Sequence, residues 1–217
     1  MGEIRSSGVQ PVGFPGCWRC PCLVSKDVDI CLDCSTGRLA RAAARACPVC
    51  DQALGAAERC SNDWCTRADR WFSVVWSVAP HVAAWRSVIR AYKYAPEMRW
   101  RVVLGRILVA YLDEHMPWFD DYDMLVPMPA FVGRGAHRHW DPVGQVVAVA
   151  ATLAGPRWDF ASGLVVKEFE TPALAGLNRP ARRTCAEGAL RESLRVPDPR
   201  AVSGCRILVI DDVFTEG

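Results

Sequence analysis

Long apolar runs and an excess of one charge are both missing from this sequence. The longest apolar stretch, residues 146–154, is far shorter than the roughly 20 residues of a transmembrane helix. No apolar segment follows Arg5, as it would in a secretory leader. The 26 basic and 24 acidic side chains nearly balance, which argues against a strongly basic nucleic-acid-binding surface. These absences predict a cytoplasmic protein without a membrane partner.

The sequence also has no Gly-Lys pair, although an apolar run at 207–210 leads into Asp211 and Asp212. Without Gly-Lys there is no P-loop, so the acidic pair is not the Mg²⁺ ligand of a P-loop NTPase. Only five residues follow the pair, whereas most of a receiver domain would follow its acidic cluster. Both of these assignments are excluded.

The same run is typical of a strand buried on both faces of a parallel sheet. Acids at the carboxyl end of such a strand lie where open α/β sheets bind ligands. Two adjacent carboxylates suit ribose hydroxyls or a divalent cation, and Thr215 with Gly217 suits a backbone cradle for a phosphate. The pattern predicts a phosphoribosyl site, with an ordinary strand that ends in a polar turn as the alternative.

Histidine is absent before His81, whereas nine of the 11 cysteines lie between Cys17 and Cys65. The odd total and the lack of a leader argue against a disulfide framework. A thioredoxin-like site would carry a single C-x-x-C near a βαβ pattern, but here close pairs repeat in a short, polar segment. A metal ion supplies folding energy to such segments, and thiolates without histidine are typical of structural zinc.

Four close cysteine pairs predict two structural Zn²⁺ ions, each held by two consecutive pairs. Three pairs have C-x₂-C spacing, and the fourth is looser, while Cys22 is an alternative to Cys20. The predicted ligands are Cys17, Cys20, Cys31 and Cys34 for one ion, and Cys47, Cys50, Cys60 and Cys65 for the other. A predicted helix at 36–46 carries Arg38, Arg41 and Arg45 on one face, either as phosphate contacts or as a solvated surface.

From about Trp71 onward, cysteine gives way to Trp, Val and Ala, which places a module boundary between residues 68 and 69. We expect a zinc-ribbon module at 1–68 and a larger domain at 69–217. Helical spacing of apolar residues predicts two core helices, one with Trp85, Val88, Ile89 and Tyr92 and one with Trp100, Val103, Leu104, Ile107, Leu108 and Tyr111. Lys93, before the break at Pro96, is either a phosphate contact or a helix C-terminal cation.

The larger domain alternates strand and helix patterns, which predicts an α/β fold with a mostly parallel sheet. A strand at 124–126 ends at Pro127, because proline cannot donate to a sheet ladder. The loop 130–140 carries Arg134, His137, Arg138 and His139. Asp141 and Pro142 then begin a helix as N-cap and first residue, so the basic loop and this helix predict an anion site, with a solvated loop as the alternative.

A further strand is predicted at 164–166, followed by a polar segment at 167–183 that contains Pro172 and Pro180. Loops of this length inside compact domains are often functional lids. The segment carries Arg179, Arg182 and Arg183, and we predict a mobile loop that reaches a ligand.

In this order, the motifs resemble the ComF/GntX-type family, in which a zinc-ribbon module precedes a type I phosphoribosyltransferase domain. The motifs are the cysteine pairs, Lys93-Tyr94, Val126-Pro127-Met128-Pro129, Arg138-His139-Trp140-Asp141, Thr171-Pro172 before Arg182, and the 207–215 run. The resemblance covers nearly the whole chain, and it lies in the order of the motifs more than in any single one.

The resemblance implies binding of Mg²⁺ with phosphoribosyl pyrophosphate (PRPP), and transfer of the phosphoribosyl group to an unidentified base. Asp211 and Asp212 would bind the ribose, directly or through Mg²⁺, and Thr215 and Gly217 would begin the 5′-phosphate loop. Arg138 would face the pyrophosphate, and Arg182 would lie in the segment that matches the family's mobile loop. The chain departs from the family at His139 in place of Gly, at Leu174 in place of Gln, and at Glu216 inside the phosphate loop. The phosphoribosyltransferase domain would also be incomplete at its C-terminus.

Two other functions stay open at this point. One is a non-catalytic adaptor of DNA uptake, in which the zinc ribbon binds single-stranded DNA or a helicase partner. The other is an inactive, truncated product.

Overall fold

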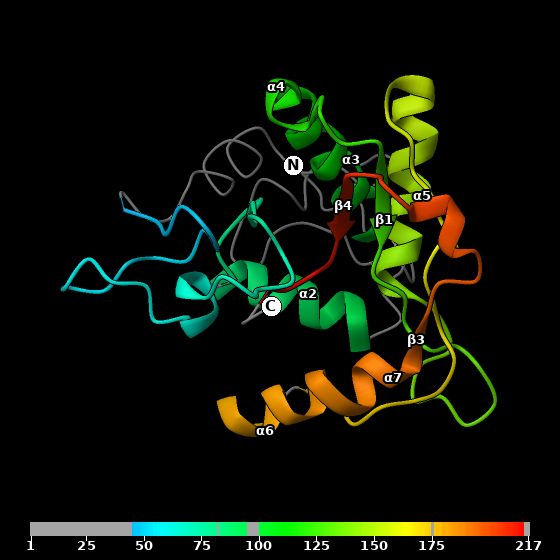
Figure 1. Ribbon diagram of the computed structural model, residues 1–217. Helices are drawn as coiled ribbons and strands as arrows, with labels where there is room; N and C mark the ends of the chain where they lie inside the picture. The colour runs from blue at the N-terminus through cyan, green and yellow to red at the C-terminus, as the bar shows by residue number, and fades with distance from the viewer. Residues whose placement is uncertain (1–44, 82, 95–99, 175, 215–217) are drawn as a thin grey trace, which may run out of the picture. The chain divides into compact units, whose positions relative to one another are not determined.

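The computed structural model describes residues 45–81, 83–94, 100–174 and 176–214 (Figure 1). The chain divides into two compact units: the first runs to Val103 and includes the residues from Val213 on, and the second runs from Leu104 to Asp212. The boundary predicted between residues 68 and 69 is based on a change in amino-acid composition, and it stays a prediction. No described helix is long and apolar enough to cross a bilayer.

The first unit contains the predicted helices of the aromatic segment. The 3₁₀ helix η2 (Asp63–Thr66) is followed by α2 (Ala83–Tyr94), and α3 (Trp100–Glu114) begins in this unit and continues into the second. Trp85, Val88 and Tyr92 are buried along α2, which is the stripe that the spacing predicts. Both helices are therefore confirmed, with α3 three residues longer than the last predicted core position, Tyr111.

The second unit alternates short strands and helices after α3. Its elements are α4 (Met116–Phe119), β1 (Met124–Pro127), α5 (Pro142–Ala154), η3 (Gly155–Arg157), β2 (Val166–Lys167), α6 (Arg179–Cys185), η4 (Ala186–Leu190), α7 (Arg191–Ser193), β3 (Leu194–Arg195), η5 (Pro199–Val202) and β4 (Ile207–Ile210). The fold is therefore mixed α/β.

Strands β1 and β4 form a small parallel sheet, with Met124 opposite Ile207 and Pro127 opposite Ile210. A parallel bridge between Leu125 and Phe160 adds a partner on the other side of β1. Leu125 and Val126 are almost completely buried, as an apolar run of this kind predicts. The strand includes Pro127, one residue beyond its predicted end, because the next ladder bond is donated by the Met128 N–H to the Ile210 carbonyl, at 2.8 Å.

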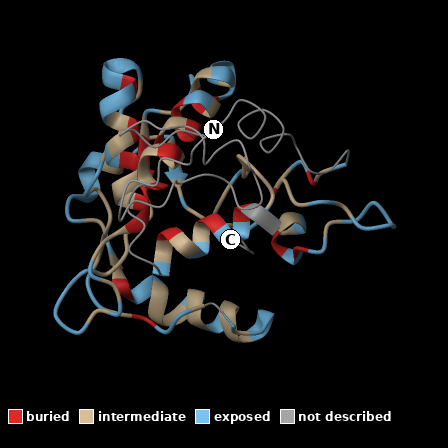
Figure 2. Ribbon diagram, turned by 180° about the vertical axis from the view of Figure 1, so that it is seen from behind, coloured by how far each residue is buried: buried red, intermediate tan, exposed pale blue. Residues whose placement is uncertain are grey.

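Helix α5 begins as the sequence predicts. The Asp141 Oδ1 accepts a hydrogen bond from the Gly144 N–H at 3.1 Å, and Pro142 lies in the first turn. Val147 and Ala150 are fully buried, and Figure 2 shows buried positions along α3 and α5. The two helices approach closely at Gly105, where an added Cβ would lie 2.7 Å from Val149 Cγ1.

The strand predicted at 164–166 is wrong in extent and in partner. The structure has only Val166 and Lys167 in β2, and they pair antiparallel with Arg195 and Leu194 of β3. The run was predicted as a further strand of a mostly parallel sheet, and Leu164, Val165 and Val166 are all only half-buried. Among the described residues, the parallel sheet is thus limited to β1, β4 and the bridge at Phe160.

The long loop predicted at 167–183 is also wrong in extent, because its last residues, 179–183, are helical and its first, Lys167, lies in β2. Asn178 caps α6 by accepting the Ala181 N–H at 3.0 Å, and Pro180 occupies the first turn. Proline was counted as a sign of a loop, although it is favourable at the start of a helix. Arg182 and Arg183 therefore lie on a helix and not on a mobile loop.

The helix predicted at 36–46 falls mostly outside the described residues. Its last residue, Ala46, forms an antiparallel bridge with Ala53, so the helix does not extend that far. Arg45 forms an ion pair with Glu58, and both side chains are exposed.

Candidate metal centre and acidic sheet edge

Cys47 and Cys50 lie on a tight turn at the start of the described chain. The Cys47 N–H donates to the Gln52 carbonyl at 2.8 Å, and the Asp51 N–H donates to the Cys47 carbonyl at 2.9 Å. Asp51 has a positive φ of 55°, a conformation that Asp tolerates better than most residues. The turn brings both sulfurs to one side, and both cysteines are buried.

Cys60 and Cys65 are joined by a different turn, which accommodates their looser spacing. The intervening residues form η2, whose N-cap Asn62 accepts the Trp64 N–H at 3.1 Å. The Asn62 N–H donates to the Cys60 sulfur at 3.3 Å, and the Cys65 N–H donates to the Asn62 carbonyl at 3.1 Å. Asn62 is 1% exposed, so a single buried side chain organises this turn.

The two turns bring the four sulfurs of Cys47, Cys50, Cys60 and Cys65 within 4.8 Å of one another. The Cys50–Cys60 sulfurs are 3.5 Å apart and the Cys60–Cys65 sulfurs are 3.6 Å apart. A tetrahedral Zn²⁺ with Zn–S bonds of about 2.3 Å requires S···S edges of roughly 3.8 Å. The four cysteines, which we call the Cys47 cluster, can therefore hold one metal ion, and the predicted grouping of the second site is compatible with a zinc ribbon.

The thiols of the Cys47 cluster differ in acidity. Burial raises the pKa of Cys47, but hydrogen bonds from the Cys50 and Val49 backbones outweigh it and lower the pKa to about 7. Burial raises the pKa of Cys50 to about 11, and burial together with the neighbouring thiols raises the pKa of Cys65 further. Four thiolates this close repel one another, so a bound cation is needed for all four to ionise together.

The chain after the cluster returns to the first cysteine turn. The Val75 N–H donates to the Val49 carbonyl at 2.8 Å, and the Ser77 N–H donates to the Asp51 carboxylate at 2.9 Å. In the same unit, the Phe72 ring makes an edge-on contact with Phe214, with ring centroids 5.5 Å apart. The C-terminal segment is thereby part of the first unit.

The acidic pair Asp211-Asp212 follows β4 directly, at the carboxyl edge of the parallel sheet (Figure 1). The Met128 N–H donates a hydrogen bond to the Ile210 carbonyl. The acidic pair, which follows Ile210, therefore lies beside the beginning of the basic loop, residues 130–140. Asp211 is exposed and Asp212 is half-buried. The Asp212 N–H donates to the Asp211 Oδ1 at 2.8 Å, which fixes the first carboxylate against the turn.

The remaining predicted site residues are distributed over both units. Arg138 lies in the loop between β1 and α5, and Arg182 lies on α6, both in the second unit. Lys93 lies in the last turn of α2, in the first unit, as expected of a helix C-terminal cation. Cys17, Cys20, Cys31, Cys34, Thr215 and Gly217 fall outside the described residues.

The sequence analysis missed Lys167, Glu170 and Thr171 as candidate site residues. Lys167 is the last residue of β2 and the other two follow it, and Glu170 accepts a hydrogen bond from His137 in the loop that contains Arg138. A signal was present, because Lys167 directly follows the apolar run 164–166. It was passed over because the segment was read as the beginning of a mobile loop.

No family model, curated protein or solved structure matches this chain. The ComF/GntX-type assignment therefore stays a resemblance, based on the order of motifs described above.

Proposed function

We propose that the second unit is a phosphoribosyl-binding domain that takes PRPP together with Mg²⁺. The observation that carries this proposal is the parallel pairing of β1 and β4, which brings the basic loop and the acidic pair to one edge of the sheet. Ligands of open α/β sheets bind at this edge. The paired residues of the two strands are 83 positions apart in the sequence, and their pairing supports the expectation drawn from the acidic motif.

Each proposed site residue would bind the part of PRPP that suits its charge. Asp211 and Asp212 would accept hydrogen bonds from the ribose hydroxyls, and Arg138 would donate to the pyrophosphate. The acidic pair also suits Mg²⁺, which binds through one or two carboxylates together with substrate oxygens and water. When bound, Mg²⁺ would offset charge that develops on pyrophosphate as its bond to the ribose breaks.

Calorimetric titration of Mg²⁺–PRPP into the full chain tests the proposal. We expect Asp211→Asn with Asp212→Asn to weaken binding by about tenfold or more, because charge-assisted hydrogen bonds are lost. Asp120 and Asp121, the other Asp-Asp pair of the chain, are a matched control, since both are exposed. Their replacement by Asn is expected to leave the affinity within about twofold. A wild-type chain that gives no heat at millimolar ligand would refute the proposal.

We also propose that the Cys47 cluster binds one structural Zn²⁺. The fit of four sulfurs to a tetrahedron supports zinc, and a site with no open ligand position is typical of a structural role. Cobalt substitution tests the coordination, because a tetrahedral Co²⁺–thiolate centre has an intense visible spectrum that an octahedral oxygen site lacks. Spectra of the full chain and of Cys60→Ser should differ by the contribution of one ion, and identical spectra would contradict the assignment.

A further inference from the structure

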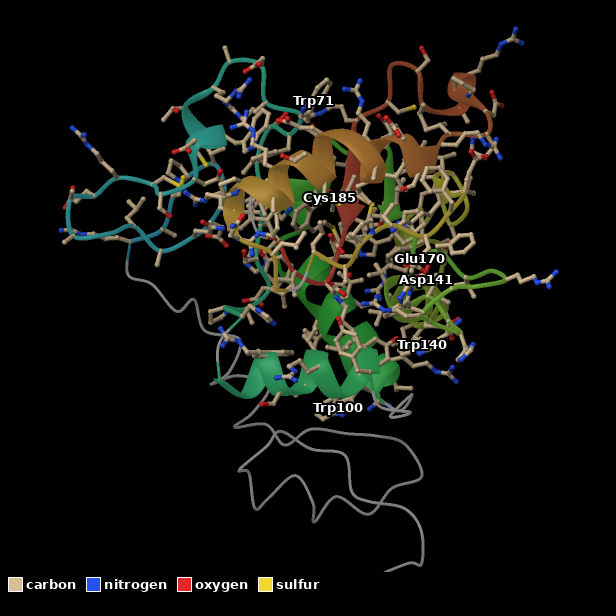
Figure 3. All side chains as sticks on the ribbon, turned by 90° about the horizontal axis from the view of Figure 1, so that it is seen from below. Trp71, Trp100, Trp140, Asp141, Glu170 and Cys185 are labelled. Carbon is tan, nitrogen blue, oxygen red and sulfur yellow. The ribbon has the colours of Figure 1, made fainter. Side chains whose placement is uncertain are left out.

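The segment from Trp71 to Ser77, which we call the tether, has no helix or strand of its own; Figure 3 shows Trp71 on this irregular stretch. Two hydrogen bonds hold the tether to the first cysteine turn. The Val75 N–H donates to the Val49 carbonyl at 2.8 Å, and the Ser77 N–H donates to the Asp51 Oδ2 at 2.9 Å. An irregular segment is ordered by contacts of this kind, so the order of the tether depends on the order of the turn.

The turn that holds the tether is part of the Cys47 cluster. Val49 lies between Cys47 and Cys50, and Asp51 follows Cys50 directly. Asp51 has a positive φ of 55°, a conformation that costs free energy in a residue other than glycine. The neighbouring thiolates also repel one another when no cation lies between them. Because metal binding stabilises the folded form of such turns, the contacts at Val49 and Asp51 should weaken when the cluster is empty.

The other end of the tether contacts the C-terminal segment. The Phe72 ring meets the Phe214 ring edge-on, with centroids 5.5 Å apart and planes at 74°. Both residues are half-buried, and both belong to the first unit. Only Val213 separates Phe214 from Asp212, so the two Cα atoms are at most about 7 Å apart. A fixed Phe214 therefore restricts where the second carboxylate of the acidic pair can lie.

We propose that the tether is a conformational link, through which metal occupancy of the Cys47 cluster controls the order of the acidic pair Asp211-Asp212. When the cluster holds its ion, the cysteine turn fixes the tether, and Phe72 fixes Phe214. When the cluster is empty, the tether and the C-terminal segment loosen together. Coupling between two sites acts in both directions, so a ligand that orders the acidic pair should tighten metal binding by the same factor.

The link rests on the proposed metal centre, and it is independent of whether PRPP binds. It gives that metal centre a consequence beyond the folding of its own two turns, because the contacts continue from the cysteine turn to the residue next to the acidic pair. Its test therefore measures the mobility of the C-terminal segment and not an activity.

The test is hydrogen exchange in the full chain, read by mass spectrometry with Zn²⁺ present and after treatment with a zinc chelator. We expect removal of the metal to speed exchange at Asp212, Val213 and Phe214 about fivefold or more, which is the usual size of coupling between sites. Exchange in α5, a helix of the second unit, should not change. This difference separates a local link from unfolding of the whole chain.

Phe72→Ala removes the link without changing a cysteine. With metal bound, this variant should already show fast exchange at Phe214, and chelation should add less than about twofold. Elemental analysis should find the same metal content as in the wild type, which shows that the cluster is still folded. Phe72→Trp keeps a ring and should restore the dependence on metal. Phe169→Ala is the matched control, because Phe169 is 43% exposed in the second unit, and it should behave as the wild type.

Two results would overturn the link alone. One is unchanged exchange at Val213 and Phe214 after the metal has been removed from the wild-type chain. The other is an equal response to the chelator in the wild-type chain and in Phe72→Ala, because the metal would then act on the acidic pair by another route. A wild-type chain that contains no metal after loading with Zn²⁺ would overturn the metal centre and the link together.

Discussion

The Cys47 cluster and the acidic sheet edge are built in opposite ways. In the cluster, two short turns position four sulfurs, two of them on buried and two on half-buried cysteines, and all four residues lie between Cys47 and Cys65. At the sheet edge, the exposed Asp211 and the half-buried Asp212 lie beside the basic loop only because two distant strands pair. The first site is assembled from local geometry and can hold one metal ion, whereas the second depends on the fold of its whole unit. This difference in construction predicts which substitutions damage the Cys47 cluster and which damage the sheet edge.

The largest effect is expected from Cys50→Ser, which removes a fully buried ligand. Structural zinc contributes on the order of 10 kcal/mol to small zinc-binding domains, so the first unit should lose cooperative unfolding. Elemental analysis should show one metal ion fewer per chain. Cys205→Ser, outside the cluster, should change neither measurement, and an equal loss of metal in both variants would break the comparison.

Lowering the pH should weaken metal binding at the Cys47 cluster. Thiols such as Cys50, with a pKa of about 11, must lose their protons to bind a metal, and the metal drives that loss. The affinity for the ion should therefore fall steeply as pH falls. A competition titration with a chromogenic chelator at several pH values measures this slope, and a flat profile would contradict thiolate ligation.

Leu125→Ala should produce the next largest effect, at the sheet. Leu125 is 2% exposed and pairs with both Leu208 and Phe160. Truncation of a buried leucine costs about 2–5 kcal/mol, and the pairing that holds the acidic edge should weaken with it. Urea unfolding followed by circular dichroism measures the loss. Val209→Ala, at a position that is 52% exposed, is the control and should cost under about 1 kcal/mol.

Asp141→Ala should have a smaller effect, because it removes one helix cap. The loss of an N-cap costs about 0.5–2 kcal/mol, here at the end of the loop that carries Arg138. Asp141→Asn retains the capping oxygen and should be nearly neutral in the same thermal or urea unfolding experiment. If both substitutions lower the free energy of unfolding equally, the charge of Asp141 stabilises the helix and its capping hydrogen bond does not.

The smallest effect concerns the pH dependence of stability. Lys167 has a pKa below its ordinary value of 10.5, so the folded state releases its proton at a lower pH than the unfolded state. Between the two pKa values the unfolded state binds more protons, and the free energy of unfolding rises with pH. Comparing unfolding of the wild-type chain and Lys167→Met across alkaline pH should show this rise only in the wild type.

The sequence predicted the features that depend on local pattern. The stripe of Trp85, Val88 and Tyr92 identified α2, and the spacing of the cysteines identified the ligands of the Cys47 cluster. The run before Asp211 identified β4 as a strand, but the prediction that it is buried on both faces is wrong, because Val209 is exposed and the other three residues are half-buried.

What the sequence did not predict depends on distant partners or on weak local signals. The antiparallel pairing of Lys167 with Leu194 is fixed by contacts between segments that share no pattern. Helix α6 is short and polar, so it shows no apolar stripe, and its only signals are Asn178 and Pro180. The hydrogen bond from the His137 N–H to Glu170, which joins the loop before α5 to the segment after β2, involves a backbone donor that almost any residue would provide.

The contact between Phe72 and Phe214 has a consequence for how this protein is made. The first unit contains residues on both sides of the second unit, so it cannot be completed until Phe214 has been synthesised. At about 5–20 residues per second, the roughly 150 residues from Cys65 to Phe214 delay that step by about 7–30 s after the four cysteines of the Cys47 cluster have been synthesised. If the cluster binds the proposed metal ion, the ion has time to bind during translation, before its unit is closed, and the metal centre would be the first fixed point on the nascent chain.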